Sequence, residues 1–167
     1  KLISSATAFS EATGTAFYEV GWNPDGGTEV GFDENGSSLK EGDAYVQVVS
    51  PFEIFPNSLS NENIEDCDSI IRARIVKTSR IREIYGVNVQ EDEALYTASS
   101  QERIAERGLV TLIERYEKPC DEYPKGRIVS VAGGELLSVE EFPYENGGGG
   151  KRTYPFIKQV ANGLPGC

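Results

Sequence analysis

The chain has 167 residues, a formal net charge of −11 and no histidine. A protein that grips DNA or RNA needs an excess of Lys and Arg to displace counterions, and anionic membranes attract basic surfaces. Both functions are therefore disfavoured, and the lack of histidine excludes His-based nucleophile arrangements and His-ligated zinc sites. No apolar run reaches the roughly 18 residues of a membrane span. The length suits one domain, which we expect over residues 1–167.

The first part of the sequence predicts a helix followed by short strands. Leu2, Ile3, Ala6 and Phe9 fall on one helical face, and Gly14 is a plausible C-terminal stop. Because the sequence has no methionine, we expect a fragment of a longer protein. Predicted strands are Thr15–Trp22, Thr28–Phe32 as its partner, and Tyr45–Val49, with turns at Asn23–Gly27 and Asn35-Gly36.

The stretch YVQVVSPFEIFPNS (Tyr45–Ser58) places large apolar residues between two prolines. Pro51 ends the strand ladder because it lacks an N–H, and Pro56 favours an extended Phe55. A partner-binding aromatic loop is one interpretation. We favour the other, a corner in which Phe52, with Ile54 or Phe55, turns into the core.

The middle of the chain predicts a strand at Ser69–Lys77, with Ile71, Ala73 and Ile75 on one face. A short helix is expected at Ser79–Tyr85, capped by Thr78 or Ser79 and stopped at Gly86. The acidic segment 89–107 has few large apolar residues, so part of it is expected to be mobile.

The last third predicts further strands. Gly108–Lys118 puts Val110, Leu112 and Tyr116 on one side, and Gly133-Gly134 is a two-residue hairpin signal. We therefore predict an α+β fold: an antiparallel, strand-rich domain of seven or eight strands, with an N-terminal helix and a short middle helix. The predicted core residues are Phe52, Ile54, Ile71, Ile75, Val110 and Leu112.

Acidic runs are the first candidates for chemistry, since two carboxylates can support acid/base catalysis without histidine. The candidates are Glu65, Asp66 and Asp68; Glu91, Asp92 and Glu93; and Glu140 and Glu141. Such runs are usually solvated faces, and none has the spacing of an EF-hand calcium loop. GGGGKRT (147–153) lacks the opening glycine and post-lysine hydroxyl of a phosphate loop. We predict no catalytic residues, cofactor or metal.

Aromatic and basic residues offer two further candidate surfaces. An aromatic platform for sugars or bases could form, although packing between strands is the favoured interpretation. Its members would be Tyr18, Trp22, Tyr116, Tyr123 and Tyr144. The basic cluster could contact phosphate or an acidic subunit, and consists of Arg72, Arg74, Arg80 and Arg82.

Several segments, taken in order, resemble the portal (head-to-tail connector) proteins of tailed bacteriophages. No single segment is diagnostic, but the ordered set covers most of the chain. It includes a Gly-Thr-aromatic strand, a strand ending Ser-Pro-Phe-Glu, and an Ile-Glu-Arg-Tyr strand leading to Pro-Lys-Gly-Arg. The segments are residues 12–27, 42–58, 79–89, 112–137 and 147–167.

The resemblance implies a wing-region fragment of a ring, usually of twelve subunits, at one capsid vertex. DNA passes through the channel of such a ring without specific binding by this fragment. The implied partners are other portal subunits, capsid or scaffold proteins, the terminase and a tail adaptor, and the implied location is the virion, assembled in the bacterial cytoplasm. The family has no catalytic residues. The alternatives are a β-rich module that binds carbohydrate or protein, and a carboxylate-dependent hydrolase.

Overall fold

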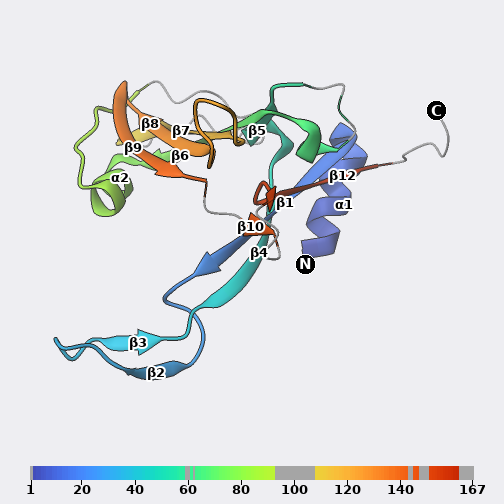
Figure 1. Ribbon diagram of the computed structural model, residues 1–167. Coiled ribbons are helices and arrows are strands. Elements are labelled where there is room, and N and C mark those ends of the chain that lie inside the picture. Colours follow the sequence, from blue (N-terminus) through green and yellow to red (C-terminus); the bar gives the residue numbers. More distant parts are fainter. Residues whose placement is uncertain are drawn as a thin grey trace. The chain divides into compact units, whose positions relative to one another are not determined.

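The computed structural model describes residues 2–58, 61, 63–92, 108–142, 145–146 and 151–161. It confirms the predicted α+β class, with an N-terminal helix α1 (Leu2–Thr13), a short helix α2 (Thr78–Tyr85) and mostly antiparallel strands (Figure 1). The strands run to β12, more than the seven or eight predicted. The chain divides into two compact units, Lys1–Val49 with Pro155–Cys167, and Ser50–Tyr154. One domain can contain two such units, so the single-domain expectation stays a prediction.

The first unit is built on a three-stranded sheet in the order β12-β1-β4. Its strands are β1 (Thr15–Asn23), β4 (Asp43–Val49) and β12 (Phe156–Val160), and β1 pairs antiparallel with both others. Helix α1 ends as predicted at Gly14, and it buries Ala6 and Ser10, whereas Leu2 and Ile3 are exposed. The helix therefore contributes small side chains to this unit's core, beside Phe17 of β1.

A separate hairpin joins β1 to β4. It pairs β2 (Glu29–Phe32) with β3 (Ser38–Lys40), so the prediction that Thr28–Phe32 partners the first strand is wrong. The reason is that β4 and β12 already occupy the two edges of β1. The hairpin turn follows the Asn-Gly prediction, because the Asp33 carboxylate accepts hydrogen bonds from the N–H groups of Asn35 (2.9 Å) and Ser37 (2.7 Å).

The second unit contains an antiparallel five-stranded sheet in the order β5-β6-β7-β8-β9. Gly133 and Gly134 have φ values of 57° and 80° between β8 and β9, which confirms the predicted hairpin. The strands are β5 (Ile54–Pro56), β6 (Ser69–Lys77), β7 (Leu109–Glu117), β8 (Arg127–Ala132) and β9 (Glu135–Glu141). Short elements are η1 (Pro51–Glu53), η2 (Ile64–Asp66), β10 (Glu145–Asn146) and β11 (Lys151–Arg152).

Helix α2 covers part of this sheet and closes its core. Ile81 is fully buried against Val110 and Leu112 of β7 and Ala132 of β8. The predicted buried face of β7 is therefore confirmed, because Val110 and Leu112 both lie in the core. The core prediction for Ile54 is also confirmed.

The prediction of burial in the core is wrong for two residues. Phe52 is 41% exposed, so it does not plug a corner of the sheet, and Ile71 is also exposed. In β6 the sheet buries the opposite face, which carries Ile70 and Arg72, while Ile75 is only half-buried. The arginine can lie inside because the Glu53 carboxylate of η1 approaches its Nε to 3.9 Å.

The two ends of helix α2 differ in how they are capped. The predicted N-cap is wrong, because Lys77 precedes the helix and provides no side-chain cap. The predicted C-terminal stop is confirmed: Gly86 has φ 70° and its N–H donates to the Arg82 carbonyl at 3.0 Å.

We expect Gly86→Ala to lower the free energy of unfolding by about 1–2 kcal/mol, because an L side chain is strained in the left-handed region. A Cβ at this position would have no heavy atom within 4 Å, so crowding does not contribute. Gly86→Asn is the control and should cost less, since asparagine tolerates this conformation. Urea unfolding measures both, and an equal cost for the two variants would contradict this account.

Candidate interaction surface

Glu65, a candidate catalytic carboxylate, instead holds three segments of the second unit together. Its Oε2 lies 2.7 Å from Nζ of Lys118, and its Oε1 accepts a hydrogen bond from the N–H of Tyr154 at 3.0 Å. The Tyr154 hydroxyl donates to the Cys67 carbonyl at 2.8 Å, and burial raises the pKa of that phenol. A carboxylate with these partners is a structural hub.

All the other acidic candidates that the structure describes are exposed, and three of them have hydrogen-bond or ion-pair partners. Glu91 accepts a hydrogen bond from the Gly108 N–H at 2.6 Å, and Asp92 accepts one from the Thr111 N–H at 3.1 Å. Glu141 pairs with Lys125 at 2.9 Å. Asp66, Asp68 and Glu140 are exposed, and Glu93 lies outside the described residues. Within the described ranges, no group of three or more acidic or cysteine side chains is placed to hold a metal ion.

The candidate aromatic platform, the less favoured interpretation, is not assembled by the described residues of either unit. In the first unit, Trp22 is 61% exposed, although its ring lies against Gly42, and Tyr18 donates to Gln159 Oε1 at 2.8 Å. In the second, Tyr116 is buried and Tyr123 lies under the Arg127 guanidinium, 3.7 Å from ring centroid to Cζ. Tyr144 and most of GGGGKRT lie outside the described residues.

The four arginines of the predicted basic cluster separate into two pairs. Arg72 and Arg74 belong to β6, where Arg74 lies 3.4 Å from the Glu114 carboxylate. Arg80 and Arg82 are exposed on α2, and Arg80 pairs with Glu83 at 2.6 Å. The α2 pair is therefore the more exposed of the two, whereas Arg72 is buried and Arg74 is partly exposed.

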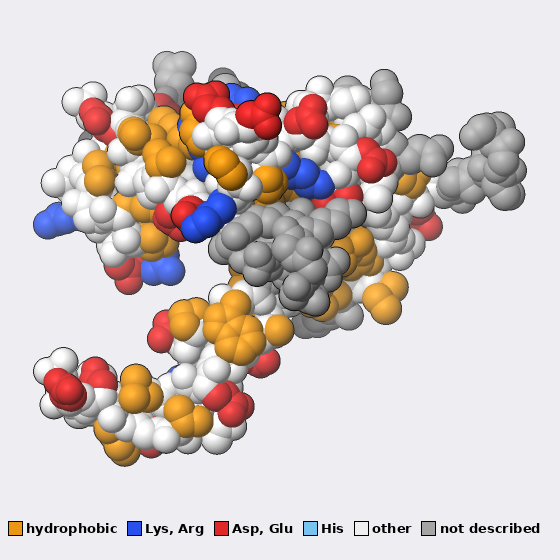
Figure 2. Space-filling model, viewed as in Figure 1, with side chains coloured by type: hydrophobic (Ala, Val, Ile, Leu, Met, Phe, Trp, Pro, Cys, Tyr) orange, Lys and Arg blue, Asp and Glu red, His pale blue; other side chains and the backbone are white. Residues whose placement is uncertain are grey.

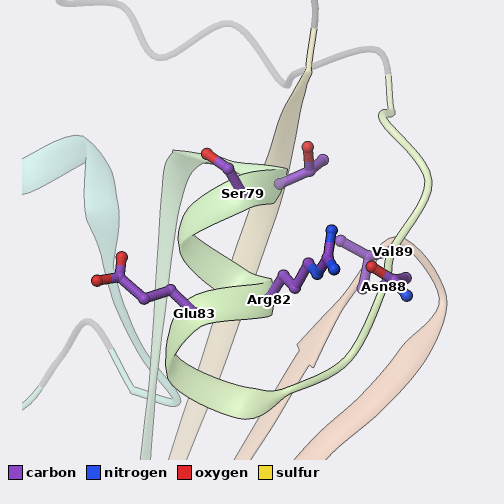
Figure 3. A pocket seen from close by; sticks show the side chains of 6 residues that line it. Ser79, Arg82, Glu83, Asn88 and Val89 are labelled. Carbon is purple, nitrogen blue, oxygen red and sulfur yellow. The ribbon is translucent and has the colours of Figure 1, made fainter.

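A pocket of about 580 Å³ lies beside α2 (Figure 3). The Arg82 side chain extends toward Asn88 and Val89, whereas Glu83 points away from them. Within the described part of the chain, no carboxylate pairs with Arg82. The lining residues are Thr78, Ser79, Arg82, Glu83, Asn88 and Val89.

The first unit exposes an apolar face of the β1–β4 pair that the sequence analysis missed. Val20 lies opposite Val46 and Trp22 opposite Ala44, so these four side chains share one face, and all are exposed. On the other face, Phe17 and Val49 are buried in the core of the unit, and Glu19 accepts a hydrogen bond from Gln47. The outer part of the pair therefore exposes apolar side chains to solvent although its inner part packs in the core.

The β2–β3 hairpin carries further exposed hydrophobic side chains. We call residues 20–46, which span the outer parts of β1 and β4 and the hairpin, the arm. Figure 2 shows hydrophobic side chains gathered over these elements. Phe32 is 65% exposed. The exposed large hydrophobic residues of the arm are Val20, Trp22, Val30, Phe32, Leu39, Tyr45 and Val46.

Two glycines let aromatic rings lie flat on the arm. A Cβ at Gly42 would overlap the Trp22 indole, and one at Gly21 would overlap the Tyr45 ring. Gly42 also has φ 80°, which disfavours other residues. The rings are therefore positioned on the arm although solvent reaches them, as expected for a preformed contact surface.

The arm is also strongly acidic. It carries Asp25, Glu29, Asp33, Glu34, Glu41 and Asp43 against the one basic residue Lys40. An apolar surface rimmed by carboxylates favours a partner that is apolar and basic.

Comparison with known proteins leaves the family open. The chain matches no protein-family model and no curated protein. Neither of the described helices has the length and hydropathy needed to cross a membrane.

Proposed function

We propose that the chain is a structural assembly module, without catalytic activity, from the wing region of a bacteriophage portal ring. The observation that carries the assembly role is the arm. Large exposed apolar surfaces with a polar rim mark protein–protein contacts, and an isolated two-stranded hairpin is marginally stable in water. The arm has both features, so it gains stability when a partner covers it.

The portal assignment rests on the ordered sequence segments described above. Among the carboxylates considered for a hydrolase, Glu65, Glu91, Asp92 and Glu141 already have structural partners, which favours an assembly role over a catalytic one. In the portal proposal the partners are other subunits, capsid or scaffold proteins, the terminase and a tail adaptor, within the virion. DNA would pass through the ring without specific contacts to this module.

The complete gene product that contains this chain is expected to form closed rings, which electron microscopy of the purified protein would reveal. Class averages should show one rotational symmetry, with twelve subunits as the family's usual number. A product that stays monomeric under assembly conditions would contradict the portal proposal. Binding to a glycan array that is lost in Trp22→Ala, with the fold intact, would support a carbohydrate-binding module instead.

A further inference from the structure

The arm and the α2 pocket have complementary chemistry. At the tip of the β2–β3 hairpin, the side chains of Phe32 and Glu34 are both exposed, and the two residues are neighbours but one in the sequence. The pocket offers Val89 and the aliphatic stem of Arg82 to an apolar group, and the Arg82 guanidinium to a carboxylate.

The charges of the two surfaces also differ in sign. The arm is acidic, whereas the strand end and helix on one side of the pocket carry Lys77, Arg80 and Arg82 against Glu83. On the other side, Glu91 and Asp92 follow the pocket-lining residues and accept hydrogen bonds from the N–H groups of Gly108 and Thr111. Complementary charge of this kind favours the correct encounter and disfavours contacts between like surfaces, such as arm to arm.

We propose that the hairpin tip of one copy docks into the α2 pocket of a second copy, with Phe32 against Val89 and Glu34 paired with Arg82. The proposal rests on the assembly function above and names its subunit contact. Because the two surfaces differ, the contact is heterologous, and each copy has one arm and one pocket. Repetition of such a contact generates a ring when the rotation between copies closes.

Charge reversal on each side tests the contact. Sedimentation velocity over a concentration series should show that the wild-type chain associates. We expect Glu34→Lys alone and Arg82→Glu alone to weaken association by about tenfold or more, since like charges then meet in every contact. Glu11→Lys is the matched control for Glu34→Lys, because it changes the net charge by the same amount but lies on α1, outside the arm. It should associate like wild type.

Mixing the two variants gives the sharper result. In an alternating assembly, the introduced lysine of one variant meets the introduced glutamate of the other, and the remaining contacts are wild type. An equimolar mixture should therefore recover association, which also shows that both variants are folded. A mixture that stays dissociated would overturn the inference, as would single variants that associate as strongly as wild type.

A fluorescent probe locates the contact. Trp22 is the sole tryptophan, so Phe32→Trp combined with Trp22→Phe places one indole at the hairpin tip. Its emission should shift to the blue only as concentration rises; a blue emission already present in the monomer would indicate docking within one chain and overturn the proposal. A chain that is monomeric up to about 1 mM would also overturn it. In that case, rings formed by the complete gene product would leave the proposed function standing.

Discussion

Replacing Phe142 with alanine is expected to lower the free energy of unfolding by about 3–5 kcal/mol, the range for removing a fully buried aromatic side chain. Phe142 has no exposed surface. Its ring packs edge-on against Tyr116, at 6.3 Å between centroids, and against Tyr154, at 5.6 Å. The substitution removes both aromatic contacts and leaves a cavity, and urea unfolding followed by circular dichroism would measure the loss.

Phe52→Ala is the matched control for Phe142→Ala. The same atoms are removed, but Phe52 is 41% exposed and belongs to a 3₁₀ turn. We expect its cost to stay below about 1 kcal/mol, as for most surface substitutions. Equal costs for the two phenylalanines would show that the second unit is not packed around Phe142. A cost of about 3–5 kcal/mol would be expected for Phe52→Ala only if the ring were buried, as the sequence had suggested.

Tyr154→Phe is expected to destabilise the chain by about 1–3 kcal/mol at neutral pH, because the buried Cys67 carbonyl loses its donor. The hydroxyl lies 2.8 Å from that carbonyl oxygen, and the ring keeps its contact with Phe142 in the variant. Tyr18→Phe is the control: it removes a hydroxyl that bonds Gln159 at an exposed position, and should cost less. If Tyr154→Phe left the free energy of unfolding in urea unchanged, the hydrogen bond would make no net contribution to stability.

The same variant should alter the response to alkaline pH. Burial is the first cause that raises the pKa of Tyr154, so the folded state disfavours the phenolate. Stability from the neutral phenol is fully present below the unfolded pKa of about 10 and is lost as pH rises above it. Between about pH 8 and pH 11 the wild type should therefore lose more stability than Tyr154→Phe. Parallel losses in the two proteins would contradict this assignment.

Local sequence signals predicted much of the fold. The alternation of Val110, Leu112 and Tyr116 identified the buried face of β7 because period two fixes which side chains share a face. Gly86 and the Gly133-Gly134 pair marked a helix end and a hairpin because each needs positive φ. These features depend on neighbours in sequence alone.

The errors occurred where a distant residue decides the outcome. In β6, alternation defined two faces but not which of them is buried, and the apolar set with Ile71 was the natural choice. The sheet instead buries Arg72, near Glu53 of η1. Likewise, Glu65 was interpreted as solvated or catalytic, since its partners Lys118 and Tyr154 are far along the chain.

The candidate site was missed for a different reason. Between β2 and β4 the sequence predicted only a turn at Asn35-Gly36, and the aromatic residues of β1 were interpreted as packing between strands. A usable signal was nevertheless present: Val20 and Trp22 alternate at strand spacing, and Val30 and Phe32 repeat the pattern after a turn. Sequence could not show that these side chains are exposed among the described residues of the unit.

The irregular pairing of the hairpin affects how far an assembly can grow. The register of β2 and β3 shifts between Glu29 and Gly31, as in a β-bulge. A bulge bends and twists a strand, which hinders further chains from adding to its free backbone edge. Copies that meet through the arm are therefore expected to join by their side chains, and we expect the hairpin not to template amyloid-like fibres.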